Sequence, residues 1–175
     1  MHVTRKTTRR FPAVNMPSSL RKARIPLFYR IFFTWVDPAI SIPSIWAHFT
    51  APDFILDTYI PRSMSVRNPD HDMLFFHLAG SFMTIAVMSA VLLRYTSDLG
   101  VWKILQLGII LYDFEICYST WYFLGKQGRL NPTVWRSEDW GNLTFMAVII
   151  AVRLAFLLGV GLKSTSIGAK GKKRA

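Results

Sequence analysis

The chain has 175 residues, of which 51% are hydrophobic, and it carries a formal net charge of +11. A soluble domain of this length does not need four apolar stretches that each match the thickness of a bilayer's hydrocarbon core. The basic residues flank those stretches and no nucleic-acid motif accompanies them, so we expect no nucleic-acid partner.

Four apolar segments predict membrane-spanning helices, because inside lipid each backbone polar group has to be hydrogen-bonded within its own segment. The predicted fold class is an all-α membrane protein, a four-helix transmembrane bundle that forms one domain over residues 27–162. A disordered basic arm is predicted before it and a basic tail after it. The predicted segments are the arm 1–26, the spans 27–51, 73–93, 101–124 and 142–162, and the tail 163–175.

The charge distribution predicts the orientation. No acidic residue occurs before Asp37 or after residue 162, whereas both ends are rich in Lys and Arg. Cytoplasmic flanks carry an excess of Lys and Arg, and four spans return the chain to the side where it began. We therefore expect both termini in the cytoplasm, where their basic residues attract membrane lipids with anionic headgroups.

Two segments bear on localisation. Residues 172–175 read Lys-Lys-Arg-Ala, which resembles the dilysine retrieval signal of endoplasmic-reticulum membrane proteins. That signal requires a cytoplasmic carboxyl terminus, so it agrees with the predicted orientation. The acid-free amino-terminal segment has the composition of a mitochondrial presequence, although prolines interrupt any amphipathic helix there. The predicted localisation is a multi-pass protein of the endoplasmic-reticulum membrane, with a mitochondrial membrane as the alternative.

The first predicted span combines a polar face with two prolines. Pro38 and Pro43 each remove a backbone donor and predict kinks. The polar residues recur every three or four positions and therefore lie on one helix face. Either this face packs inside the bundle or it lines a pocket. The polar residues are Arg30, Thr34, Asp37, Ser41, Ser44 and His48.

Three acids and one arginine lie near the middles of predicted spans. A charge at the bilayer centre costs roughly 2.5–3.5 kcal/mol on insertion scales, so it usually faces a partner or a wet cavity. Asp37, Asp113 and Glu115 outnumber Arg153. One acid can form a structural ion pair with Arg153 or Arg30, and the surplus predicts a carboxyl group that acts as a general acid. Arg153 would then orient one acid and keep it ionised.

Further residues are candidates for a substrate pocket around these charges. His48 and His77 are placed at similar depth, and Asn142 precedes Arg153 by eleven residues, which puts both on one face of a helix. Aromatic side chains of the first and third spans supply candidate walls. The candidate substrate-binding residues are Trp35, His48, His77, Tyr112, Tyr118, Trp121 and Asn142. Two histidines give incomplete ligation and Cys117 is the only cysteine, so no metal and no cofactor are expected.

Three segments resemble a known family. Residues 28–38, residues 135–142 and the run from Arg153 to Gly159 resemble small fungal integral-membrane proteins that are catalogued only as a domain of unknown function. The resemblance covers 27–162 and implies a four-helix topology without an assigned activity. In architecture alone, the chain is more distantly similar to the EXPERA group, which includes the emopamil-binding sterol isomerase and non-catalytic sterol-binding relatives.

These observations predict a membrane enzyme that acts on a lipophilic small molecule by acid–base isomerisation or cyclisation, in a lipid, terpenoid or other specialised-metabolite pathway. The alternative is a non-catalytic lipid- or sterol-binding or scaffold protein whose buried charges are structural. A small transporter is a third possibility. It would require a homo-oligomer, because four helices enclose little volume.

Overall fold

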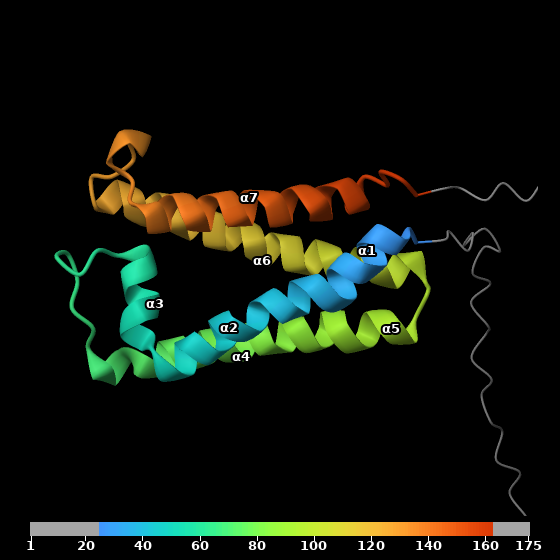
Figure 1. The fold of residues 1–175 in the computed structure, drawn as a ribbon, viewed down its shortest axis with the longest axis horizontal. Helices are drawn as coiled ribbons and strands as arrows, with labels where there is room; N and C mark the ends of the chain where they lie inside the picture. Colours follow the sequence, from blue (N-terminus) through green and yellow to red (C-terminus); the bar gives the residue numbers. More distant parts are fainter. Residues whose placement is uncertain (1–24, 163–175) are drawn as a thin grey trace, which may run out of the picture.

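The computed structural model describes residues 25–162, and every regular element within them is helical (Figure 1). The tail predicted for 163–175 and nearly all of the arm predicted for 1–26 lie outside the described residues. The elements in chain order are α1 (Leu27–Ile31), the π-helical turn η1 (Phe32–Val36), α2 (Asp37–Thr50), α3 (Pro52–Tyr59), the 3-10 turn η2 (Pro69–His71), α4 (Asp72–Val87), the π-helical turn η3 (Met88–Leu92), α5 (Leu93–Tyr95), α6 (Leu99–Lys126), the 3-10 turn η4 (Pro132–Val134) and α7 (Ser137–Leu157).

The first helix continues through both of its prolines. In a regular α-helix the carbonyl of Thr34 would accept a hydrogen bond from residue 38, but Pro38 has no amide hydrogen. The chain forms η1 just before this proline, and Arg94 of α5 donates from Nη2 to the Thr34 carbonyl at 2.8 Å. The predicted irregularity at Pro38 is therefore a π-helical turn that precedes it, and Pro43 lies inside α2.

The ends of α6 and α7 have recognisable stop and start signals. The Asp98 carboxylate accepts hydrogen bonds from the amides of Gly100 and Val101, which caps α6, and Gly128 follows its last turn with φ 68°. The Asp139 carboxylate accepts from the amide of Arg136 at 2.8 Å and so fixes the start of α7. Compared with the predicted span 142–162, this helix is shifted toward the amino terminus at both ends, and two positive-φ glycines follow it.

The long helices pack as two pairs. α2 lies along α4, and α6 lies along α7 (Figure 1). The pairs meet at the α1 end in a buried cluster that includes Tyr29, Phe33, Leu93, Trp102 and Phe156. At the same end the Tyr29 hydroxyl donates to the carbonyl of residue 160 at 3.1 Å.

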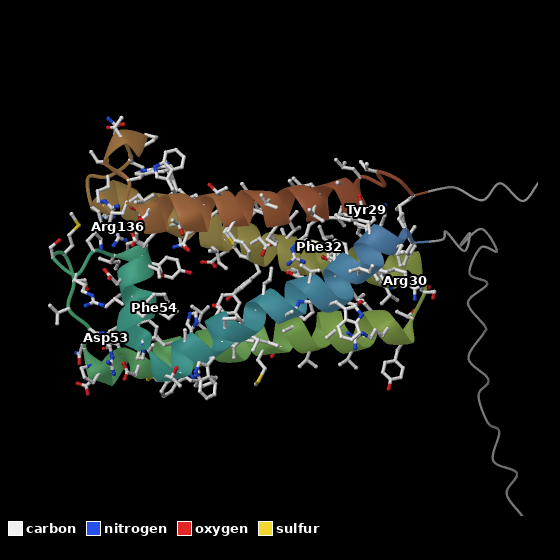
Figure 2. The ribbon with its side chains drawn as sticks, in the orientation of Figure 1. Tyr29, Arg30, Phe32, Asp53, Phe54 and Arg136 are labelled. Atoms are coloured by element: carbon white, nitrogen blue, oxygen red, sulfur yellow. The ribbon has the colours of Figure 1, made fainter. Side chains whose placement is uncertain are left out.

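α3 stands across the opposite end of the molecule, between α2 and α7 (Figure 1). The sequence did not lead us to expect this helix. Arg136, at the start of α7, lies at the end of the molecule that carries α3 (Figure 2). Its Nη1 is 3.4 Å from Oδ1 of Asp57 on α3. Arg67 joins Asp53 of α3 at 2.7 Å to Asp72 of α4 at 2.6 Å. Arg67 therefore links the connection between α3 and α4 to both of these helices.

Two helical segments are long and apolar enough to cross a membrane, Pro69–Tyr95 and Ser137–Leu157. The other two long stretches, α1 to α2 and α6, contain Asp37, Asp113 and Glu115 within their apolar runs. The structure thus confirms that residues 25–162 are all-helical in their regular elements and include two candidate membrane helices.

Candidate functional site

A buried cluster of charged and polar side chains joins three helices. Arg153 of α7 directs Nη2 at both carboxylate oxygens of Asp37, at 3.0 and 2.9 Å. Its Nε lies 2.7 Å from Oδ2 of Asp113 on α6. Its Nη1 donates to Oε1 of Gln106 at 2.7 Å. All four side chains are buried, so the guanidinium is enclosed by its partners.

The local structure explains how these residues converge. Gln106 and Asp113 are seven residues apart on α6, which is about two helical turns, and therefore lie on one face. Asp37 begins α2 directly after the π-helical turn. α6 packs on α7, which places Arg153 opposite the face of Gln106 and Asp113.

The cluster lies on the wall of a cavity between the two helix pairs. The cavity measures about 170 Å³ and its lining is mostly apolar. α2, α3, α4, α6 and α7 all contribute to it. Besides Asp37, Asp113 and Arg153, its lining includes Ser41, Ser44, Tyr59, Phe82, Ile85, Ile109, Tyr112, Cys117, Thr120, Asn142, Phe145, Met146 and Ile149.

Five of the predicted site residues come together at this cavity, namely Asp37, Tyr112, Asp113, Asn142 and Arg153. Asp37 and Asp113 both contact Arg153, so the predicted ion pair involves two acids. The polar face of the first span both packs and lines the pocket, since Ser41 and Ser44 border the cavity together with Asp37.

His48 is buried beside the cavity but is not part of its lining. Its Nδ1 lies 2.7 Å from the carbonyl of Ser44, and its ring packs against Phe82 with centroids 5.4 Å apart. His77 is exposed on α4. Among residues 25–162, no three His, Cys, Asp or Glu side chains are grouped so that they could hold a metal ion.

Four other predicted residues are exposed and do not line the cavity: Trp35, Glu115, Tyr118 and Trp121. The face of α6 that borders the cavity contains Asp113 and Cys117. A residue two positions after Asp113 points about 200° away from it around the helix. Glu115 accordingly lies on the outer surface. Trp35 is 63% exposed and packs under the guanidinium of Arg94, 4.0 Å from its ring centroid.

Sequence reasoning missed Gln106 and Tyr59. Gln106 carried a usable signal, since a polar residue two turns before Asp113 in an apolar run belongs to the same face. Tyr59 belongs to the unexpected helix α3. Although 36% of its surface is exposed, its ring lines the cavity, and desolvation there raises the pKa of its phenol above the ordinary value.

Polar contacts hold α3 in place at the end of the cavity. The amide of Asn142 donates from Nδ2 to the carbonyl of Thr58 at 3.1 Å, and Arg136 contacts Asp57. A buried pair of Arg129 and Asp139 supports the start of α7 beneath these contacts. Asn142 therefore both lines the cavity and fastens the helix that covers its end.

The comparisons with known proteins give a family without an activity. A search of curated proteins and a search of solved structures each found no match. One family model, Domain of unknown function (DUF7704), matches residues 22–163 and includes every residue of the buried cluster. The family that was anticipated as one of unknown function is thus confirmed, and the chain belongs to the DUF7704 domain family.

Proposed function

We propose that the chain is a four-span membrane protein whose cavity binds a lipophilic small molecule and isomerises or cyclises it by acid–base catalysis. The spans would be the α1-to-α2 stretch, the α4-to-α5 stretch, α6 and α7. Large apolar side chains are exposed along each of them, for example Trp46, Val87, Leu107 and Val148. Such broad apolar exposure suits lipid better than water.

The orientation with both termini in the cytoplasm and the location in the endoplasmic-reticulum membrane belong to the same proposal. Their support is the basic composition of both ends of the sequence. The similarity to the EXPERA group rests on the number of spans and on acids in the first and third of them.

One observation carries the catalytic proposal: two carboxyl groups share a single guanidinium on the wall of an apolar cavity. With all three groups ionised the cluster would carry a charge of −1 in surroundings of low polarity, where unpaired charge is costly. One proton neutralises it. The cluster then contains one carboxylic acid and one carboxylate, which are the two partners that proton transfer requires.

An isomerisation by this pair is balanced without an oxidant or reductant. The acid form of Asp37 or Asp113 adds its proton to one carbon of an alkene, and a cation forms at the neighbouring carbon. The other carboxylate removes a proton from a carbon next to the cation, and the double bond reforms at a new position. In a cyclisation, a second alkene attacks the cation before the proton leaves. Arg153 is a positioning residue that holds both carboxyl groups.

The cavity size limits what fits inside it. A cavity of roughly 150 Å³ with apolar walls accommodates one benzene molecule, and this cavity measures about 170 Å³. The part of the substrate beside the acids therefore has the size of about one six-membered ring. Phe82, Tyr112 and Phe145 place aromatic rings in the lining, and such rings stabilise a cation.

A specific observation also favours a second function, a non-catalytic lipid- or sterol-binding or scaffold protein. Arg153 contacts side chains of α2 and α6 from its place on α7, so the cluster ties three helices together. A purely structural role would account for these contacts. In that case the cavity binds a lipid or sterol without changing it.

The two functions are separated by comparing lipid extracts of cells that express the wild type, Asp37→Asn, Asp113→Asn or Asp70→Asn at matched protein levels. Asp70 is an exposed carboxylate outside the cavity and serves as the control. If the protein is a catalyst, cells that express Asp37→Asn or Asp113→Asn should accumulate the same precursor as cells that lack the protein. Cells that express Asp70→Asn should match the wild type. Four identical profiles would refute the catalytic function and leave the binding or scaffold role.

A further inference from the structure

α4 and α6 present a polar stripe on the outside of the molecule. We call it the α4–α6 outer face and define it by His77, Ser81 and Thr84 of α4 and by Gly108, Glu115 and Tyr118 of α6. All six residues are exposed. Among the described residues, Glu115 has no hydrogen-bond or ion-pair partner. An ionisable side chain on a lipid-facing helix surface is costly unless it is paired.

The two halves of this face lie on the same side of the bundle. On α4, Phe76 packs against Phe49 of α2, while Phe82 and Ile85 border the cavity. At 100° per residue, Ser81 and His77 continue around α4 past the cavity, away from α2 and toward α6.

The same geometry applies to α6. Lys103 reaches α7, where its Nζ donates to the Leu157 carbonyl at 2.9 Å. Tyr112 points at Phe82 of α4, with centroids 5.9 Å apart. Glu115 lies further around the helix on the α4 side, away from α7. The outer surfaces of α4 and α6 therefore face the same side of the molecule, and the Phe82–Tyr112 contact links the two helices.

His77 and Glu115 also lie at nearly the same depth along the bundle. The contact between Phe82 and Tyr112 aligns the two antiparallel helices. From this contact His77 is five residues away and Glu115 is three residues away, both toward the end that carries α3. With a rise of about 1.5 Å per residue, their depths differ by about 3 Å. One face thus presents a carboxylate and an imidazole at matching depth.

We propose that the α4–α6 outer face binds a second copy of this chain in the membrane. A two-fold axis along the membrane normal preserves depth, so Glu115 of each copy meets the partner's His77. The face is self-complementary because it supplies one acceptor and one donor per copy, and two charge-assisted hydrogen bonds form across it. A Cβ added at Gly108 would meet no atom within 4 Å, so this glycine leaves room for the close helix approach that membrane interfaces favour.

This inference rests on the membrane placement proposed above and not on the chemistry of the cavity. If the wild type does not self-associate, only the proposed dimer is contradicted, and the lipid-extract comparison still tests the cavity. A wrong catalytic assignment would leave pairing intact.

The test uses the full chain, labelled with two colours and reconstituted at low density in lipid bilayers, with pairing followed by single-molecule co-localisation. Glu115→His places two imidazoles opposite each other, and His77→Glu places two carboxyl groups opposite each other. We expect either variant alone to weaken self-association by about tenfold or more, since both hydrogen bonds are lost. Glu138→His changes an exposed acid away from this face and should pair like the wild type.

The deciding sample mixes the two variants. A Glu115→His copy opposite a His77→Glu copy regains both pairs, so mixed dimers should outnumber either homodimer. Co-localisation at random levels for the wild type would overturn the proposal. So would equal pairing of all combinations, because the contact would then lie on another surface. Melting curves of each variant in detergent identify any protein that fails to fold. In that case the milder variants Glu115→Gln and His77→Gln are mixed instead, and their mixed dimer should still exceed either homodimer because it regains one of the two Glu–His pairs.

Discussion

The guanidinium of Arg94 donates a hydrogen bond of 2.8 Å to the backbone carbonyl of Thr34. In an α-helix this carbonyl would accept from the amide of residue 38, but Pro38 has no amide hydrogen. Arg94 is 60 residues away in the sequence and also stacks on Trp35. The carbonyl left without a partner by a proline inside an apolar helix thus receives its hydrogen bond from a neighbouring helix.

Replacing Arg94 by Met should lower the free energy of unfolding by roughly 1–2 kcal/mol, because the carbonyl loses a charged donor. The variant Pro38→Ala restores an amide at residue 38. In its background we expect Arg94→Met to cost less. Thermal melts in detergent of the wild type, Arg94→Met, Pro38→Ala and the double variant provide the measurement. If Arg94→Met costs the same in the Pro38→Ala background, Arg94 acts mainly through its contact with Trp35.

The buried cluster predicts an unequal response to removal of its charges. Arg153→Met leaves two carboxyl groups facing each other without a cation, which should cost on the order of 3–5 kcal/mol. Asp37→Asn or Asp113→Asn leaves Arg153 paired with the remaining acid, so each should cost less. The variant that carries Asp37→Asn, Asp113→Asn and Arg153→Met has no charge in the cluster and should regain part of the loss. Equal melting temperatures for Arg153→Met and the single acid variants would contradict this order.

The sequence allowed the long helices and part of the site to be predicted, for identifiable reasons. Apolar runs set the four long stretches, and the three-to-four spacing from Thr34 to His48 placed a polar face on the first of them. An excess of mid-helix acids over arginines pointed to Asp37 and Asp113, which the structure brings to Arg153. Charge counting could not separate Asp113 from Glu115, because only packing decides which face of α6 turns inward.

α3 was missed because eight residues within a connecting segment are too few for a clear apolar period. Its start signals were present, since Pro52 occupies the first helical turn and Asp53 follows it. Tyr59 was missed along with the helix. The position of α3 depends on contacts with residues far away in the sequence, such as Asn142, and no local pattern records them.

We expect Tyr59 to make the stability of the fold sensitive to alkaline pH. Because desolvation raises the pKa of its phenol in the folded protein, the neutral form is favoured by folding. Its contribution to stability is full below the ordinary tyrosine pKa of about 10 and is lost as the pH rises through the folded-state value. Tyr59→Phe should therefore flatten the fall in melting temperature above about pH 10. Tyr95→Phe, at a side chain that is 87% exposed, is the matched control and should follow the wild type.

We expect the hydrogen bond from Asn142 to limit local opening of α3 at the end of the cavity. Its amide donates to the Thr58 carbonyl at 3.1 Å, and loss of a hydrogen bond of this kind costs roughly 1 kcal/mol. Asn142→Leu should raise amide hydrogen exchange in α3 about fivefold relative to the wild type, since opening would become easier by that amount. Thr144→Val changes an exposed residue two positions further along α7 and should leave exchange in α3 unchanged. Faster exchange across all helices of Asn142→Leu would mean that the bond supports the whole bundle, whereas unchanged exchange would mean that Arg136 and Asp57 suffice to hold α3.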